Sequence, residues 1–430
     1  MSEFVLDFFL LRDPNVRWVV IAILLICSST AIVGSFAFLR KRALIGDAVS
    51  HAILPGICLA FMLTGGKHPF WLMAGAILIG LLSMKIIDFI TVNSRIKPDT
   101  ALALVMSVFY GLGVLLLTRI QSSGNAAQAG LDKFLFGKAA AMMQEDVITY
   151  SLFSIFLLLV ITILFKSFVV TIFDRQHAAL IGLPVNKLEG VMAILTVIAI
   201  AIGIQAVGVV LMSALLITPA AAARYWTNNL KIMLLLAALF AMVSGVSGAF
   251  VSYAMPKMPT GPWIVMFLTL ITGISVLIGS KKGYWVTRKG KQQINQKIIQ
   301  ENVLKALYQL GEVRNNFEDP FLKSELRKKR KYGRLRQRNA LKQLEKEACI
   351  KIEGEYIYLT RKGLDEGQRI TRLHRLWEVY LTKYLKLPAD HVHEDAEAME
   401  HLITPELEIE LEKVLDYPLI DPHDSPIPRK

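Results

Sequence analysis

An aspartate and a histidine stand four residues apart inside a long apolar stretch near the amino terminus. A helix would place Asp47 and His51 on one face. A carboxylate oxygen together with an imidazole nitrogen suits a first-row divalent metal ion, and ionisable groups inside a membrane span are costly and therefore functional candidates. The pattern predicts contact with a metal ion. The alternative is a buried Asp–His pair that only holds helices together. Pro55 and Gly56 follow and are expected to interrupt the helix.

A second concentration of imidazoles and carboxylates lies toward the carboxyl end. His374 and Glu378 are one helical turn apart, and Glu397, Glu400 and His401 share a face at spacings of three and four residues. Mixed imidazole and carboxylate ligands without thiolate favour manganese, iron or zinc. Histidine and glutamate also cluster by chance on surface helices, so this pattern is less specific than the first.

The elements that position these residues divide the chain in two. Of 430 residues, 54% are hydrophobic, and the apolar excess lies in residues 1–280, whereas residues 281–430 resemble ordinary soluble sequence. We expect an all-α polytopic membrane domain followed by a mostly α winged-helix cytoplasmic domain. Stretches of about 20 apolar residues, the length that crosses the hydrocarbon, predict about nine spans, at 18–39, 44–64, 69–90, 99–118, 147–165, 190–205, 207–223, 231–253 and 262–279.

The loop charges predict how the spans are oriented. Lys and Arg concentrate after the first, third, fifth, seventh and ninth spans. Positive residues mark cytoplasmic loops, so we expect a multi-pass protein of the cell's inner (plasma) membrane, with its amino terminus outside and its carboxyl-terminal domain in the cytoplasm. Part of the net charge of +13 has the same cause.

A short amphipathic segment at 173–185 lies between the fifth and sixth spans, on the expected cytoplasmic side. Gly182 and Pro184 end it. It is either a plain interfacial helix or a docking helix for a motor subunit. The chain contains no GxxxxGK[ST] phosphate-binding loop, so ATP that drives transport would be hydrolysed by a partner.

The soluble part predicts a winged helix-turn-helix. Helical patterns at 294–310, 321–330 and 332–347 precede an alternation of apolar and polar residues around Glu353-Gly354-Glu355, which signals a hairpin. In such a domain the basic third helix would enter a DNA major groove. The alternative is a solvated basic face near anionic lipid. The candidate DNA-binding residues are Lys331, Arg334, Arg336 and Arg338.

Residues 17–280 resemble the permeases of zinc, manganese and iron ABC importers. The resemblance rests on residues 42–56, 135–137, 173–185 and 216–224, in that order. It implies a permease homodimer, two cytoplasmic ATP-binding subunits and an extracytoplasmic metal-binding protein. It also implies that Asp47 and His51 line the metal path. The implied ATPase-coupling residues are Phe173, Asp174, Ala178, Gly182, Leu183 and Pro184.

Residues 298–428 resemble the metal-dependent repressors of the diphtheria-toxin-repressor and manganese-transport-regulator family, through residues 359–363, 374–378, 392–396, 400–401 and 421–428. The resemblance implies two ligand sets, the first with His374, Glu378 and His393 and the second with Glu397, Glu400 and His401. Glu397 stands where manganese-responsive members carry glutamate and iron-responsive members carry cysteine, which favours manganese.

The first helix of the tail departs from that family. Asn302 and Lys305 stand where acidic or sulfur ligands are expected. A lysine ammonium repels a divalent cation, so the departure argues against metal-switched DNA binding. The alternatives are that the domain senses metal through the remaining ligands, dimerises, or serves only as a scaffold.

Together these patterns predict a non-enzymatic permease subunit of an ABC importer for a divalent transition metal, with manganese favoured over zinc and iron. The expected domains are the permease at 1–280, a linker at 281–290, the winged helix at 291–372 and a metal-binding or dimerisation domain at 373–430. The alternative is a membrane-tethered, metal-responsive DNA-binding regulator. One span suffices for a tether, so nine spans containing Asp47 and His51 favour transport.

Overall fold

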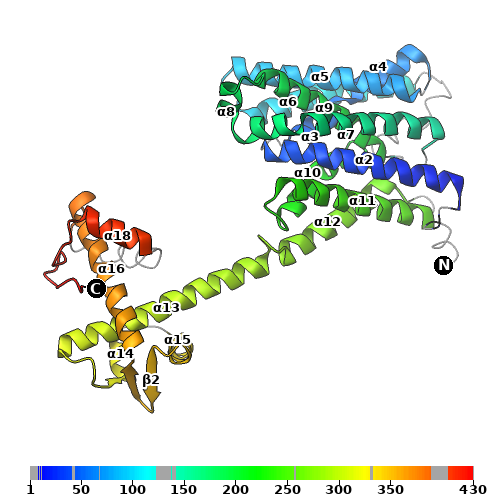
Figure 1. The fold of residues 1–430 in the computed structure, drawn as a ribbon. Coiled ribbons are helices and arrows are strands. Elements are labelled where there is room, and N and C mark those ends of the chain that lie inside the picture. The colour runs from blue at the N-terminus through cyan, green and yellow to red at the C-terminus, as the bar shows by residue number, and fades with distance from the viewer. Residues whose placement is uncertain are drawn as a thin grey trace. The chain divides into compact units, whose positions relative to one another are not determined.

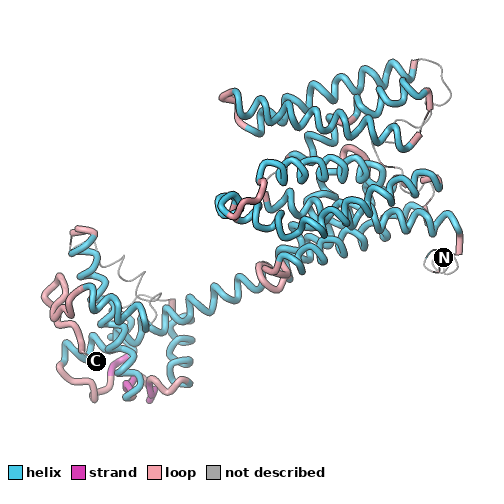
Figure 2. Tube along the Cα trace, turned by 45° about the horizontal axis from the view of Figure 1, so that its top comes forward, coloured by secondary structure: helices cyan, strands magenta, loops and turns pink. Residues whose placement is uncertain are grey.

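The structure is a computed structural model that describes residues 8, 10, 12–40, 44–66, 68–122, 137, 142–255, 258–329, 333–388 and 405–429. The chain forms two compact units, Met1–Thr287 and Arg288–Lys430. This division falls within the segment 281–290, which is helical from Tyr284 onward. Within the described residues helices dominate both units, and the named strands belong to the second (Figure 2).

The first unit is a bundle of long apolar helices that run side by side (Figure 1). Eight helical segments in the described part of the chain are long and apolar enough to cross a membrane, which confirms the all-α polytopic class. The helices are α2 (Pro14–Leu39), α3 (Ile45–Ala52), α4 (Leu54–Thr64), α5 (Pro69–Asn93), α6 (Pro98–Gln121), α7 (Gln144–Phe173), α8 (Arg175–Leu180), α9 (Val185–Val207), α10 (Met212–Arg224), α11 (Leu230–Ala254) and α12 (Thr260–Ile278).

The seventh predicted span, 207–223, differs from the expectation. It folds as α10, which has 13 residues, so at 1.5 Å per residue it is about 20 Å long. That is shorter than the roughly 30 Å hydrocarbon thickness. The physical reason is that α9 ends at Gly208, whose φ of +86° suits glycine, and residues 208–211 form a turn instead of helix.

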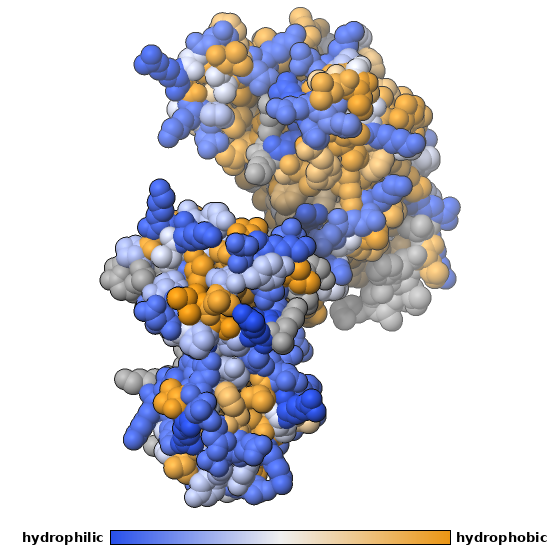
Figure 3. Space-filling view, turned by 60° about the vertical axis from the view of Figure 1, so that its left-hand side comes forward, coloured by the Kyte–Doolittle hydropathy of each residue, from blue (hydrophilic) through white to orange (hydrophobic). Residues whose placement is uncertain are grey.

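The second predicted span is held in the interior of this unit. The segment made of α3 and α4 is mostly buried, as are α2 and α9, whereas only 22% of the residues in the spans of α6, α7 and α12 are buried. Hydrophobic side chains form broad patches on the membrane unit in Figure 3. The α4–α5 contact needs small residues, because a Cβ at Gly56 would lie 2.2 Å from the Gly75 oxygen.

Pro55 divides the second span into α3 and α4, as the sequence predicts. Proline has no amide hydrogen and its ring clashes with the carbonyl four residues earlier, here that of His51. The helix accordingly ends at Ala52 and restarts at Leu54, and the Gly56 amide donates to the Ile53 carbonyl at 2.9 Å. Asp47 and His51 therefore lie on a short helix of their own.

The second unit contains the predicted winged helix. Its elements are α13 (Tyr284–Arg314, from Arg288), β1 (Phe321–Leu322), α14 (Lys323–Lys329), α15 (Arg334–Lys346), β2 (Ile350–Glu353), β3 (Tyr356–Leu359), α16 (Arg361–Tyr384) and α18 (Pro405–Val414). The antiparallel sheet has the order β1-β3-β2, with Ile357 opposite both Phe321 and Ile352. Val303, Leu307, Phe321 and Leu344 join its buried core. Residues 321–322, predicted to be helical, pair as a strand because their backbone completes this sheet.

Candidate functional site

Asp47 and His51 lie together on one face of α3. The His51 Nε2 atom is 3.7 Å from Asp47 Oδ1, and the exposed fraction is 42% for the Asp47 side chain and 19% for that of His51. The rest of this helix is largely buried. The pair thus occupies the one accessible stripe of a short, otherwise enclosed helix.

Neighbouring helices fix the position of this stripe. The His51 ring stands edge-on to Tyr110 of α6, with 5.1 Å between the ring centroids. On the other side, a Cβ at Gly46 would meet the Leu216 side chain of α10 at 2.7 Å. The absence of a side chain at Gly46 therefore lets α10 pack closely against α3. The arrangement can offer one carboxylate and one imidazole to a cation, and the role of these two residues remains a prediction.

The segment 173–185 forms a capped turn between two membrane helices. Asp174 accepts a hydrogen bond from the His177 amide at 2.8 Å and thereby caps α8. Ala178 is fully buried, whereas Phe173, Leu180 and Ile181 are largely exposed. Helix α8 lies at the end of the bundle opposite to the start of α2 (Figure 1).

The chain reverses directly after α8. Gly182 adopts a φ of +81°, a left-handed conformation that glycine tolerates best. The Leu183 amide donates to the Ala178 carbonyl at 3.0 Å, and Pro184 precedes α9. The predicted coupling residues thus form one continuous structure with an exposed apolar tip. Their role in coupling stays a prediction.

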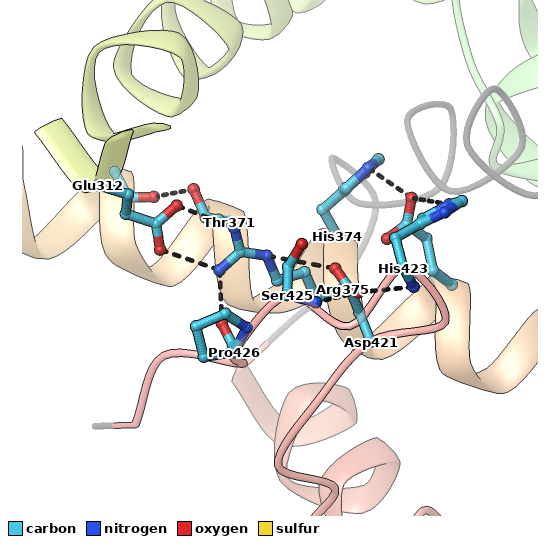
Figure 4. A network of polar contacts seen from close by, with 10 residues as sticks. Glu312, Thr371, His374, Arg375, Asp421, His423, Ser425 and Pro426 are labelled. Atoms are coloured by element: carbon cyan, nitrogen blue, oxygen red, sulfur yellow. Dashed lines mark hydrogen bonds and ion pairs between the residues drawn. The ribbon is translucent and has the colours of Figure 1, made fainter. Parts of the chain in front are cut away.

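In the tail, α16 brings His374 and Glu378 together, and the carboxyl-terminal segment adds a residue that the sequence interpretation did not select. His374 Nε2 lies 3.1 Å from Glu378 Oε1, and His423 Nε2 lies 4.0 Å from the same oxygen (Figure 4). The His374 and Glu378 side chains are nearly buried, whereas that of His423 is 44% exposed. The only sequence signal for His423 was its place in the 421–428 segment.

Arg375 holds that carboxyl-terminal segment against α16 (Figure 4). Its guanidinium donates to both carboxylate oxygens of Glu312, at 2.9 and 2.8 Å, and to the Pro426 carbonyl. It also lies 3.5 Å from Asp421. Asp421 in turn accepts hydrogen bonds from the His423 and Ser425 amides, at 2.8 Å each. These fixed contacts orient the loop that carries His423.

The remaining predicted tail ligands, His393, Glu397, Glu400 and His401, lie outside the described residues. Among the residues that are described, no group of three or more His, Cys, Asp or Glu side chains is arranged to hold a metal ion. Asn302 and Lys305 are buried on α13, with Lys305 0% exposed. A buried ammonium requires negative or polar partners, so this position disfavours a nearby metal ion, as the sequence suggests.

The basic helix of the winged domain is α15. Arg336 and Arg338 are exposed on it, whereas Lys331 lies outside the described residues and the Arg334 side chain is not described. A groove of about 630 Å³ separates α13 from α15, and its charged lining residues are all cations: Arg336, Lys342 and Lys346. The wing is different, because its tip carries Glu353 and Glu355, which repel phosphate.

Fold and site together define a multi-pass membrane protein whose second unit is a winged-helix domain followed by a helical domain. The chain belongs to the ABC 3 transport family, whose profile matches residues 12–279. A second profile, "Iron dependent repressor, metal binding and dimerisation domain", matches residues 360–429. The predicted fusion of a permease with a repressor-like domain is confirmed.

Individual relatives agree with this assignment. The chain is 41% identical over 379 residues to "Manganese transport system membrane protein MntC" of Bacillus subtilis, covering 88% of this chain and 86% of the relative. It is 44% identical over 274 residues to "Zinc transport system membrane protein TroC" of Treponema pallidum, covering 64% of this chain and 92% of the relative. Among solved structures, PsaBC from Streptococcus pneumoniae in complex with Fab is similar, with a TM-score of 0.60, 33% identity, and coverage of 67% of this chain and 99% of that one.

Proposed function

We propose that this chain is the membrane permease subunit of an ABC importer that carries a divalent transition metal ion, with manganese the favoured cargo, into the cytoplasm. The observation that carries the proposal is the Asp47–His51 pair on the accessible stripe of α3. A cation crossing hydrocarbon needs compensating charge and ligands on its path. Asp47 supplies a negative charge and His51 supplies a nitrogen ligand. The names of the relatives MntC and TroC support manganese and zinc as cargo.

A second copy of the chain would cover the stripe. The Asp47 side chain is 42% exposed in a single chain, and a carboxylate that faced lipid would be costly. Burial in a permease homodimer, around a shared path, removes that cost. The same permease would take its metal from an extracytoplasmic metal-binding protein.

The capped turn at α8 is the proposed contact for cytoplasmic ATP-binding subunits. Phe173, Leu180 and Ile181 are exposed apolar side chains at one end of the bundle, where a protein groove is a suitable partner. If α8 is cytoplasmic, the start of α2 at the opposite end of the bundle is outside the cell, as the loop charges predict.

The test is metal uptake by cells that carry the importer with wild-type chain or with Asp47→Asn. The amide keeps the size of the side chain and removes its charge, so we expect uptake of manganese, zinc and iron to fall to background while membrane insertion is unchanged. Asp99→Asn is the matched control, since Asp99 is an exposed residue in the first turn of α6, and it should behave as wild type. Wild-type uptake by Asp47→Asn would remove this residue from the path.

For the tail we propose a regulatory role through metal binding in which His374 and Glu378 supply two ligands and the other predicted tail ligands, His393 among them, complete the site. His374 Nε2 lies 3.1 Å from Glu378 Oε1, and imidazole and carboxylate groups are ligands that manganese, iron and zinc accept. Calorimetry with purified tail should show binding of manganese that His374→Ala weakens. Unchanged binding by that variant would exclude His374 as a ligand.

A DNA-binding regulator tethered to the membrane is the second candidate. The carboxylate-free lining of the α13–α15 groove and the exposed Arg336 and Arg338 favour it. DNA binding by the detergent-purified chain should then fall steeply with salt, and replacing both arginines with glutamine should reduce the salt dependence. Salt-independent or undetectable binding would leave transport as the function.

A further inference from the structure

One carboxylate near the start of α9 joins the ends of two other helices. Glu189 lies 3.4 Å from Arg40, which follows the last residue of α2, and 3.4 Å from Arg175 in α8. Arg175 also donates to Asn186 Oδ1 at 3.3 Å. The exposed side-chain fractions are 16% for Arg40, 27% for Glu189 and 63% for Arg175. Glu189 therefore connects an exposed residue of α8 with an inward-lying residue of α2.

From this carboxylate, packed side chains continue to α3. Met192 and Ala193, one turn along α9 from Glu189, line a cavity of about 30 Å³ together with Arg40 and Ile45. Helix α3 also packs against α9, and Ile45 packs against the buried core cluster that includes Met192. Ile45 is the first residue of α3 and stands two positions before Asp47. Helix α9 thus contacts both α8 and the helix that carries the predicted metal residues.

Stability does not account well for this arrangement. Partly exposed ion pairs contribute little to stability, and the Arg175 side chain is mostly exposed. A role in positioning the helices explains the arrangement better. If α8 moves away from the bundle, either the Arg175–Glu189 ion pair breaks or Glu189 and the start of α9 move with α8. Such a movement also alters the ion pair of Arg40, because Arg40 contacts the same carboxylate.

We propose that Glu189 is a positioning residue that transmits movement of α8 to the helix that carries Asp47 and His51. The inference rests on the proposed function, because it takes α8 as the contact with the ATP-binding subunits. The proposed docking role of α8 needs only its exposed apolar tip. The further inference is that coupling also depends on a single carboxylate shared by two arginines.

The experiment uses the permease co-purified with its ATP-binding subunits, reconstituted into vesicles with its metal-binding protein. It measures manganese uptake and ATP hydrolysis together, for wild type, Glu189→Gln, Glu189→Asp and the matched control Asp99→Asn. We expect Glu189→Gln to keep its partners and its hydrolysis but to lower the manganese carried per ATP by about fivefold or more, the usual range of coupling between sites. Glu189→Asp should recover part of this ratio, and the control should keep all of it.

A double-mutant cycle separates this role from a general weakening. Arg40→Gln should lower the ratio as Glu189→Gln does, and the double variant should be no worse than either single one, because both remove the same contact. An unchanged ratio in Glu189→Gln, additive losses in the double variant, or loss of the ATP-binding subunits from Glu189→Gln would each overturn the inference. Absence of uptake by the wild-type complex would instead refute the proposed function.

Discussion

Glu408 is a buried carboxylate that holds α18 against α16. Its side chain is 3% exposed, it accepts a hydrogen bond from Arg372, whose side chain is 4% exposed, and it lies 3.3 Å from the half-buried Arg369. Burial lowers the pKa of Arg372, an effect that the nearby Glu412 opposes. The buried Arg372 guanidinium therefore needs neighbouring carboxylates to compensate its charge inside the tail.

Glu408→Gln removes one charge of this buried pair and leaves the other. Breaking a buried pair in this way costs about 3–5 kcal/mol. Glu412 lies 3.4 Å from Arg372 and stays in place, so we expect the lower end, about 3 kcal/mol. That is a large share of the roughly 5–15 kcal/mol by which domains are stable.

Urea unfolding of purified residues 288–430, followed by circular dichroism, measures this loss. The matched control is Glu410→Gln, because Glu410 is exposed on the same helix and its loss should cost less than about 0.5 kcal/mol. Replacing Arg372 and Glu408 together with methionine should restore most of the stability, since no buried charge is then left alone. A loss below about 1 kcal/mol in Glu408→Gln would refute the reasoning.

Three further predictions concern other parts of the chain. Lys305→Glu replaces a fully buried cation of α13 with a carboxylate, so manganese should bind the tail more tightly in calorimetry; unchanged affinity would place Lys305 away from the site. Burial raises the pKa of the Cys349 thiol. In a chain with Cys27 and Cys58 replaced by alanine, Cys349 should therefore react with maleimide at pH 8 at least about tenfold more slowly than after denaturation. Equal rates would contradict its burial. Gly182→Val together with Leu183→Ala should release the ATP-binding subunits during co-purification, because valine strains the left-handed turn after α8; an intact complex with unchanged hydrolysis would count against the docking role.

Local features of the site could be predicted from the sequence because they depend on spacing alone. Asp47 and His51 share a face of α3, and His374 contacts Glu378, since four residues make about one helical turn. The break at Pro55 follows from proline chemistry. The hairpin of the wing follows from alternation and from Glu353-Gly354-Glu355, with Gly354 at a φ of +61°.

Contacts between residues far apart in the chain could not be predicted in this way. His423 meets Glu378 because contacts such as those of Arg375 with Asp421 and Pro426 hold the carboxyl-terminal segment on α16, and no periodicity connects these positions. Glu189, Arg40 and Arg175 each look like an ordinary charge at the end of a membrane helix. The apolar composition of 207–223 predicts a span. The helix that forms there, α10, is shorter because a turn follows α9, and it packs against α2 and α11.

The charges inside the tail decide what a metal ion can do there. Arg375 engages Glu312 and Asp421, and Arg372 engages Glu408, so these three carboxylates already neutralise cations that belong to the protein. A metal ion that bound to them would have to displace a guanidinium and leave it buried, which costs several kcal/mol. The His374–Glu378 pair is different, because a metal ion there displaces only an imidazole contact of 3.1 Å. Metal binding to the described part of the tail should therefore act locally at α16 and the His423 loop, while the fixed ion pairs keep the fold together without metal.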